Sequence, residues 1–178
     1  MAHANGMGVE AELGHVGSGS NYAVDGYTAL TDPDEAVRFV EETGVDFLAV
    51  AIGTAHGAYK GTPEIRFNLL EEIASKVSVP LVMHGGSGSG DENIAKACKM
   101  GICKVNVAND LYKGEVEALK AANTEGNGAY MIYEYLSAGY KKVAKHYFDI
   151  CGSAGKADLY SYLKRPGLPM GTMFGAVK

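Results

Sequence analysis

The sequence has 178 residues, of which 47% are hydrophobic and 21% are charged, and its formal net charge at pH 7 is −5. This composition excludes a disordered chain and a disulfide scaffold, and it provides enough apolar side chains for one globular core. A negative charge without a lysine or arginine cluster argues against a nucleic-acid surface. The apolar runs are too short to cross a bilayer, and no secretory signal precedes them. The three cysteines lack metal-ligand spacing, which favours a reduced, cytoplasmic protein.

The first predicted strand carries two carboxylates on one face. The chain begins with the pattern of a helix end closed by Gly6, and the alternation in residues 9–13 then predicts a strand. Glu10 and Glu12 share one face of that strand, where unpaired burial would be costly. We expect a metal ion, a cationic partner or water beside them, or else an exposed edge strand. The long loop at residues 14–31 is typical of a functional lid or a mobile segment.

Short apolar runs then alternate with amphipathic segments. Asp32 fits the N-cap of a helix with Pro33 in its first position, and Gly44 ends that helix. Ser89 and Glu92 have the spacing of a capping box. Further strands are predicted at residues 47–52, 79–83 and 102–107, and further helices at residues 66–76, 91–100, 110–122 and 129–149. The alternation predicts a single α/β domain with a parallel sheet.

Two histidines directly follow predicted buried strands. His56 comes after the strand at residues 47–52, and His84 comes after the strand at residues 79–83. Ligands bind at the carboxyl ends of parallel strands, so two imidazoles that converge there are candidate metal ligands. Two hydrogen-bonded histidines at strand ends are an equally weighted interpretation.

Two polar segments at the same sheet edge are candidates for phosphate binding. The turn at residues 85–88 reads Gly-Gly-Ser-Gly and leads from a strand into a helix, where backbone N–H groups and the helix dipole favour an anion. The segment at residues 106–109 reads Asn-Val-Ala-Asn and lies after the next strand. Its amides could bind hydroxyls or phosphate, although an asparagine there could instead cap the following helix. The glycine turn could also be a simple connection.

Together these residues resemble the C-terminal half of a class II, metal-dependent ketose-bisphosphate aldolase. The matching motifs are VEAELGHVG at 9–17, TGVDFLAVAIGTAHGAYKG at 43–61, VPLVMHGGSG at 79–88 and GICKVNVANDL at 101–111. The resemblance covers residues 1–155 and implies part of a TIM (β/α)8 barrel, of which about half, four βα units and C-terminal helices, is present. Residues 156–178 form a tail without an assigned structure. If four strands precede the chain, the turn at residues 85–88 follows barrel strand seven and the segment at residues 106–109 follows barrel strand eight. TIM barrels often bind phosphate at these two positions.

The resemblance also implies a site and a reaction. Zinc or another divalent metal would be bound by His56 and His84, with Glu10 matching a glutamate at a second, more buried metal position; a monovalent cation is a further cofactor that it allows. The dihydroxyacetone phosphate site is matched by Gly57, Gly85, Gly86, Ser87, Asn106, Val107, Ala108 and Asn109. The implied reaction is the cleavage or formation of a fructose or tagatose 1,6-bisphosphate, with dihydroxyacetone phosphate and glyceraldehyde 3-phosphate as the products of cleavage.

The chain departs from the family pattern in its missing Asp-His pair. The family's proton-donor aspartate and third zinc-binding histidine have no counterpart here, so we name no catalytic residue and expect the chain alone to be inactive. Its length holds half of a barrel with open sheet edges, so we expect a homo-oligomer or a partner that supplies the N-terminal half. The alternatives are a non-catalytic phosphate-binding or assembly subunit of a split barrel, and a metal-independent phosphosugar enzyme on the same barrel.

Overall fold

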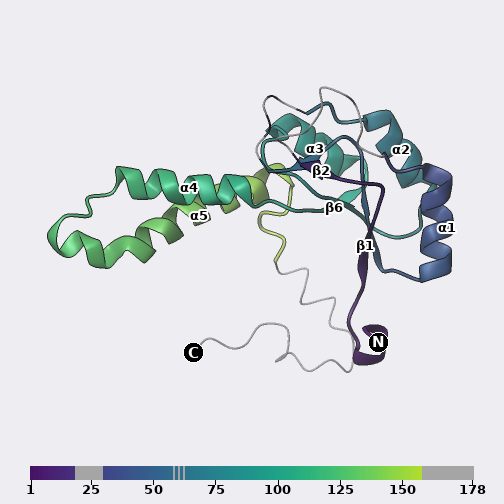
Figure 1. Cartoon of the computed structure of the whole chain (residues 1–178), viewed down its shortest axis with the longest axis horizontal. Helices are drawn as coiled ribbons and strands as arrows, with labels where there is room; N and C mark the ends of the chain where they lie inside the picture. Colours follow the sequence, from purple (N-terminus) through teal and green to yellow (C-terminus); the bar gives the residue numbers. More distant parts are fainter. Residues whose placement is uncertain (19–29, 58, 60, 62, 158–178) are drawn as a thin grey trace.

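The main element of the protein is a parallel sheet of four strands, which lies in the right-hand part of Figure 1. The computed structural model describes residues 1–18, 30–57, 59, 61 and 63–157, so most of the loop at 14–31 and nearly all of the tail at 156–178 lie outside the described residues. The strand order is β1 (Glu10–Leu13), β3 (Phe47–Val50), β5 (Leu81–Met83) and β6 (Ile102–Val105). All three neighbouring pairs are parallel. The predicted α/β fold with a parallel sheet is therefore confirmed.

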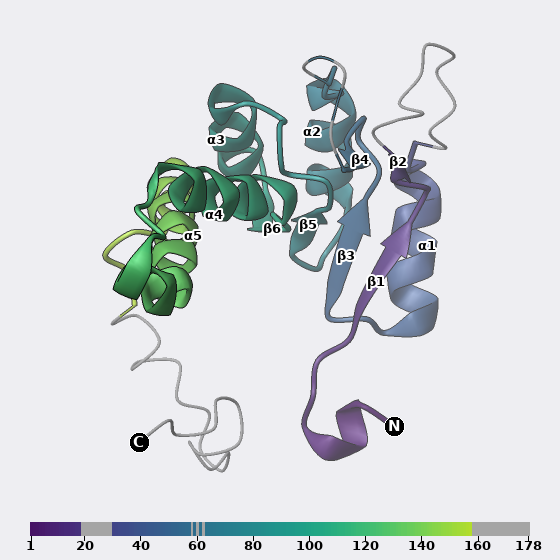
Figure 2. The same cartoon turned by 60° about the vertical axis from the view of Figure 1, so that its left-hand side comes forward.

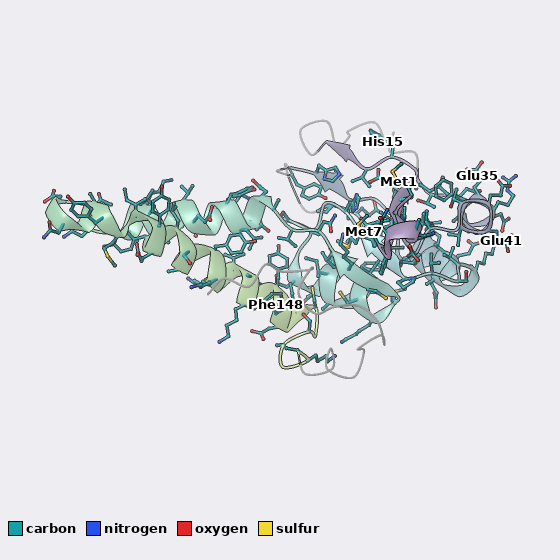
Figure 3. All side chains as sticks on the ribbon, turned by 90° about the horizontal axis from the view of Figure 1, so that it is seen from below. Met1, Met7, His15, Glu35, Glu41 and Phe148 are labelled. Carbon is teal, nitrogen blue, oxygen red and sulfur yellow. The ribbon has the colours of Figure 1, made fainter. Side chains whose placement is uncertain are left out.

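Three helices share one hydrophobic core with the sheet. They are α1 (Pro33–Thr43), α2 (Phe67–Lys76) and α3 (Asp91–Lys99). In register across the sheet, Leu48, Leu81 and Ile102 point into this core. Each helix contributes two fully or nearly buried side chains: Ala36 and Val40 from α1, Leu70 and Ile73 from α2, and Ile94 and Ala97 from α3. The polar face of α1 turns outward, with Glu35 and Glu41 directed away from the sheet (Figure 3).

The opposite face of the sheet carries its charged side chains. In register, Glu12 lies beside Ala49, Ala49 beside Val82, and Val82 beside Lys104. Because side chains alternate along a strand, Glu10 shares this face with Glu12. The pleat therefore places carboxylates from β1 and an ammonium from β6 on the side of the sheet away from α1, α2 and α3.

The strands end earlier than the apolar runs predicted. Residues 51 and 52 are buried but follow β3, because the backbone of Ala51 bonds to another segment: its N–H donates to Thr31 Oγ1 at 2.8 Å, and its carbonyl accepts from Thr31 N at 3.1 Å. The third predicted strand begins at Leu81, after Pro80, whose carbonyl accepts from Leu48 N at 3.1 Å. The chain thus turns into loops at the carboxyl end of the sheet.

The predicted caps are confirmed in α1, and α3 begins at Asp91 as predicted, but its predicted capping box is wrong. The Asp32 carboxylate accepts from Asp34 N and Glu35 N at 2.9 and 2.8 Å, and Gly44 closes the helix in a left-handed conformation. The capping box of Ser89 and Glu92 does not form. Gly90 is the N-cap of α3, and the buried Ser89 hydroxyl donates to Gly85 O at 3.1 Å instead. The opening turn is a short 3-10 helix (His3–Asn5) closed by Gly6, as the pattern predicted.

Two further helices form a hairpin that extends away from the sheet (Figures 1 and 2). They are α4 (Asn109–Ala121) and α5 (Ile132–Ile150), and the connection ends in a 3-10 turn at Gly126–Met131. Figure 3 shows Phe148 near the base of this hairpin. The helices cross where Gly114 and Gly139 meet, and a Cβ on Gly139 would collide with the carbonyl oxygen of Gly114. Among the described helices, none combines the length and apolar composition needed to span a bilayer.

Candidate metal and phosphate site

The carboxyl end of the sheet brings the two histidines together. His84 directly follows β5, and His56 ends β4 (Ala55–His56), which pairs in parallel with β2 (Gly17–Ser18) in a small separate sheet. The ring centroids of His56 and His84 are 5.8 Å apart. The structure therefore places the two predicted metal ligands beside each other.

Glu12 completes a group that could hold a metal ion. One ligand atom from each of Glu12, His56 and His84 lies within 4.8 Å of the others. Two imidazoles and one carboxylate are a donor set that catalytic zinc sites use, so these residues fit a divalent metal. The resemblance assigned a second metal position to Glu10, whereas Glu12 was predicted only to share its strand face, with a metal ion as one possible partner of that face. The signal was available, because the strand period of two places both glutamates on one face.

Glu10 lies in a charge network beside this group. His84 Nε2 lies 3.0 Å from Glu10 Oε1, and His84 Nδ1 lies 2.6 Å from Glu12 Oε2. Lys104 Nζ forms an ion pair with Glu10 Oε2 at 2.9 Å. Burial raises the pKa of Glu10, but the contacts with His84 and Lys104 outweigh burial and hold this pKa below its ordinary value. The acidic strand face therefore has cationic and imidazole partners, as one interpretation predicted. Within the described sheet β1 is also an edge strand with exposed glutamates, as the other interpretation predicted.

A cavity of about 390 Å³ lies next to the metal-ligand group. Its walls contain seven of the eight residues predicted to bind substrate, together with the metal-ligand candidate His56 and one further side chain. The lining residues are His56, Gly57, Gly85, Ser87, Asn106, Val107, Ala108, Asn109 and Tyr112. Sequence reasoning missed Tyr112, although its position three residues after Asn109 on a helix places both on one face.

Gly86, the eighth predicted substrate residue, lies behind the cavity wall. Its N–H donates to Asn106 O at 2.9 Å, and a Cβ there would lie 2.6 Å from Val105 Cγ1. Gly85 adopts a positive φ of 68°, and a Cβ there would collide with Ala55 O. The two glycines therefore let the loop after β5 pass close to β4 on one side and to the end of β6 on the other.

Ser87 caps the helix that follows the next strand. Its buried Oγ accepts from Ala108 N at 3.1 Å and from Asp110 N at 3.3 Å, at the start of α4. Asn109 is the first residue of α4, so the alternative in which its side chain caps this helix is wrong. The cap therefore comes from a different loop. Ala108 and Asn109, at the N-terminus of α4, line the cavity, where a helix dipole favours an anion.

Comparison with known proteins identifies the family of this chain. A family model described as class II fructose-bisphosphate aldolase matches residues 1–156. The structure is similar to the YdjI aldolase from Escherichia coli K12, with 38% identity and a TM-score of 0.72 over 87% of this chain and 53% of that chain. It shares its fold with a fructose-bisphosphate aldolase from Campylobacter jejuni, with 23% identity and a TM-score of 0.59 over 85% of this chain and 53% of that chain.

The chain thus spans about half the length of the structures it matches. The match to the family model includes every strand of the sheet, all residues of the metal-ligand group and all residues of the cavity. By this match the protein belongs to the class II fructose-bisphosphate aldolase family.

Proposed function

We propose that this chain supplies the metal-binding and phosphate-binding half of a class II aldolase site. The supporting observation is that His56 belongs both to the metal-ligand group and to the wall of the cavity. A cation held by Glu12, His56 and His84 would therefore lie at the mouth of the space that receives the substrate. The four parallel strands, each paired with the next strand of the same sheet along the chain, support a place for residues 1–155 in a (β/α)8 barrel.

The proposed reaction is the cleavage or formation of the carbon–carbon bond of a ketose 1,6-bisphosphate. A bound divalent cation, with zinc expected, supplies Lewis-acid polarisation of the substrate carbonyl oxygen. The N-terminus of α4 and the loop at residues 85–88 hold the phosphate of the dihydroxyacetone phosphate moiety, so that binding energy is used for positioning. Lys104 pairs with Glu10 and so keeps that carboxylate charged beside the metal ligands.

The chain alone is expected to bind metal and phosphate without turnover. The Asp-His pair of the family has no counterpart in this sequence. Proton transfer is therefore expected to require a group from another polypeptide segment. Within the described residues, β1 and β6 each pair with one strand only, which supports association with a partner half or with another copy. The three cysteines are free thiols, which supports a reducing compartment such as the cytoplasm.

Two measurements test the proposal. Calorimetry with zinc, and then with dihydroxyacetone phosphate, should show one site for each in the purified chain, and His56→Ala should abolish zinc binding. His3→Ala is the matched control, because His3 pairs with Asp46 at the other end of the sheet. Steady-state cleavage of fructose and tagatose bisphosphates should be absent in the chain alone.

The leading alternative is a non-catalytic subunit that only assembles with other chains. The open strand edges and the exposed aromatic side chains of the hairpin, such as Tyr133 and Phe148, favour this alternative. An assembly subunit should bind neither zinc nor dihydroxyacetone phosphate, so the same titrations separate the two functions. Clear turnover by the chain alone would refute the division of the site between two polypeptide segments.

A further inference from the structure

Tyr147, on α5, is connected to the loop at residues 85–88 through the carboxylate of Asp110. The Tyr147 hydroxyl, on α5, donates to Asp110 Oδ2 at 2.7 Å. The same carboxylate oxygen accepts from Gly88 N at 2.8 Å. Neither Tyr147 nor Asp110 lines the cavity, so both act on its wall from behind. Tyr147 and Asp110 are 37 residues apart in the sequence. The two hydrogen bonds together connect α5 to Gly88 in the loop.

The loop and the start of α4 are held to each other in both directions. Ser87 accepts from the backbone of Ala108 and Asp110, and the Asp110 side chain accepts from the backbone of Gly88. Gly88 has a positive φ of 75°, which glycine adopts readily, and its N–H is held by the Asp110 carboxylate. Asp110 is thus the residue through which α5 reaches the loop.

The charge states of the pair fit this role. Burial raises the pKa of Asp110, but the hydrogen bonds from Tyr147 and from the Gly88 amide outweigh burial and lower it below its ordinary value. Burial and the neighbouring carboxylate raise the pKa of Tyr147. A neutral hydroxyl therefore donates to a charged carboxylate, the stronger class of hydrogen bond.

A second contact from α5 reaches the far end of the same loop. His146 Nε2 lies 3.0 Å from Asp91 at the first residue of α3, which follows the loop. Both partners are largely exposed, so this ion pair contributes little. The half-buried contact between Tyr147 and Asp110 is consequently the stronger of the two.

We propose that Tyr147 is a positioning residue that, through Asp110, holds the loop at residues 85–88 in the shape that binds the substrate phosphate. This proposal rests on the proposed function of the cavity. The competing explanation is that Tyr147 only packs α5 against the core, since its ring also contacts the buried hydrophobic cluster. Tyr147→Phe separates the two explanations, because it keeps the ring and removes only the hydroxyl.

The experiment compares Tyr147→Phe with Tyr140→Phe, which removes the same atom from an exposed position on the same helix. Calorimetry with inorganic phosphate and with dihydroxyacetone phosphate measures binding, and amide hydrogen exchange measures the opening of Gly88. A lost hydrogen bond to a charged group predicts about tenfold weaker phosphate binding and about tenfold faster Gly88 exchange in Tyr147→Phe. Zinc affinity should stay close to that of Tyr140→Phe. The melting temperature should fall by a few degrees, about what the loss of one hydrogen bond to a charged group predicts.

Each outcome decides a specific point. If the unsubstituted chain binds phosphate and Tyr147→Phe binds it equally well, the role of Tyr147 is refuted while the cavity's function stands. If the unsubstituted chain binds neither phosphate compound, the proposed function fails, and the positioning role fails with it. If Tyr147→Phe melts too early to be compared, Asp110→Asn provides the same test, because it keeps the side-chain volume and weakens both contacts. Parallel losses of zinc and phosphate binding in that variant would show a general loss of the fold and would refute a specific effect on the loop.

Discussion

Replacing Gly86 with alanine should displace the glycine loop from β6. The added Cβ would lie 2.6 Å from Val105 Cγ1 and 2.9 Å from Asn106 O. Ordinary contacts between carbon atoms are about 3.5–4 Å, so the loop must retreat by about 1 Å. That movement costs about 1–3 kcal/mol in overpacking, and it breaks the bond from Gly86 N to Asn106 O, which contributes about 1 kcal/mol more. We expect the free energy of unfolding to fall by about 2–4 kcal/mol.

Urea denaturation of Gly86→Ala measures the stability loss, and phosphate titration measures the effect on the cavity. A displacement of about 1 Å in a positioning loop can reduce function by about a hundredfold, so phosphate affinity should fall by at least tenfold. Gly61→Ala is the control, because a Cβ there meets no atom of the described, non-adjacent residues within 4 Å. Unchanged stability and affinity in Gly86→Ala would refute the argument that the loop needs this close approach.

Three further predictions concern other parts of the molecule. Glu12→Gln should weaken zinc binding by about tenfold or more in a competition titration. Glu64→Gln, on an exposed loop, is the control and should leave zinc binding unchanged. Equal zinc affinities in the two variants would remove Glu12 from the ligand set. Because the pKa of Asp110 is lowered in the folded chain, its carboxylate stabilises the fold at pH values above 3.8, its ordinary pKa. This stability is lost as the pH falls through the folded pKa. Asp110→Asn cannot titrate, so its urea midpoints should depend less on pH in the acid range. Gly139→Ala gains about 1 kcal/mol in helix propensity but forces a Cβ into the Gly114 carbonyl, so the melting temperature should fall; a rise would show that propensity outweighs the close crossing.

The convergence of the site could be predicted from strand direction, although His56 lies in β4, a short strand in a segment that the sequence predicted to be a loop. His56 and His84 follow parallel strands, and parallel strands end at one edge of a sheet. The same rule placed the asparagine segment beside the glycine loop, where the structure forms a shared cavity. The period of two in β1 also placed Glu10 and Glu12 on one face, although it did not distinguish which of them lies closest to the histidines.

Contacts between distant segments could not be predicted in this way. The sequence assigned Ser89 to a helix cap by local spacing, but the loop is folded so tightly that its hydroxyl bonds to Gly85 O. Ser87 instead caps a helix that begins more than twenty residues later, which no local pattern reports. The bond of Tyr147 to Asp110 likewise depends on how α5 packs against α4, a property of the folded chain.

The order of the strands has a kinetic consequence. Each strand of the main sheet pairs with the next strand of that sheet along the chain, so every pairing closes a loop of one strand–helix unit. Such a topology has a lower contact order than a sheet whose first and last strands must meet, because less chain entropy is lost before each pairing forms. The sheet can therefore assemble progressively during synthesis, from β1 towards β6, with each completed unit serving as the template for the next.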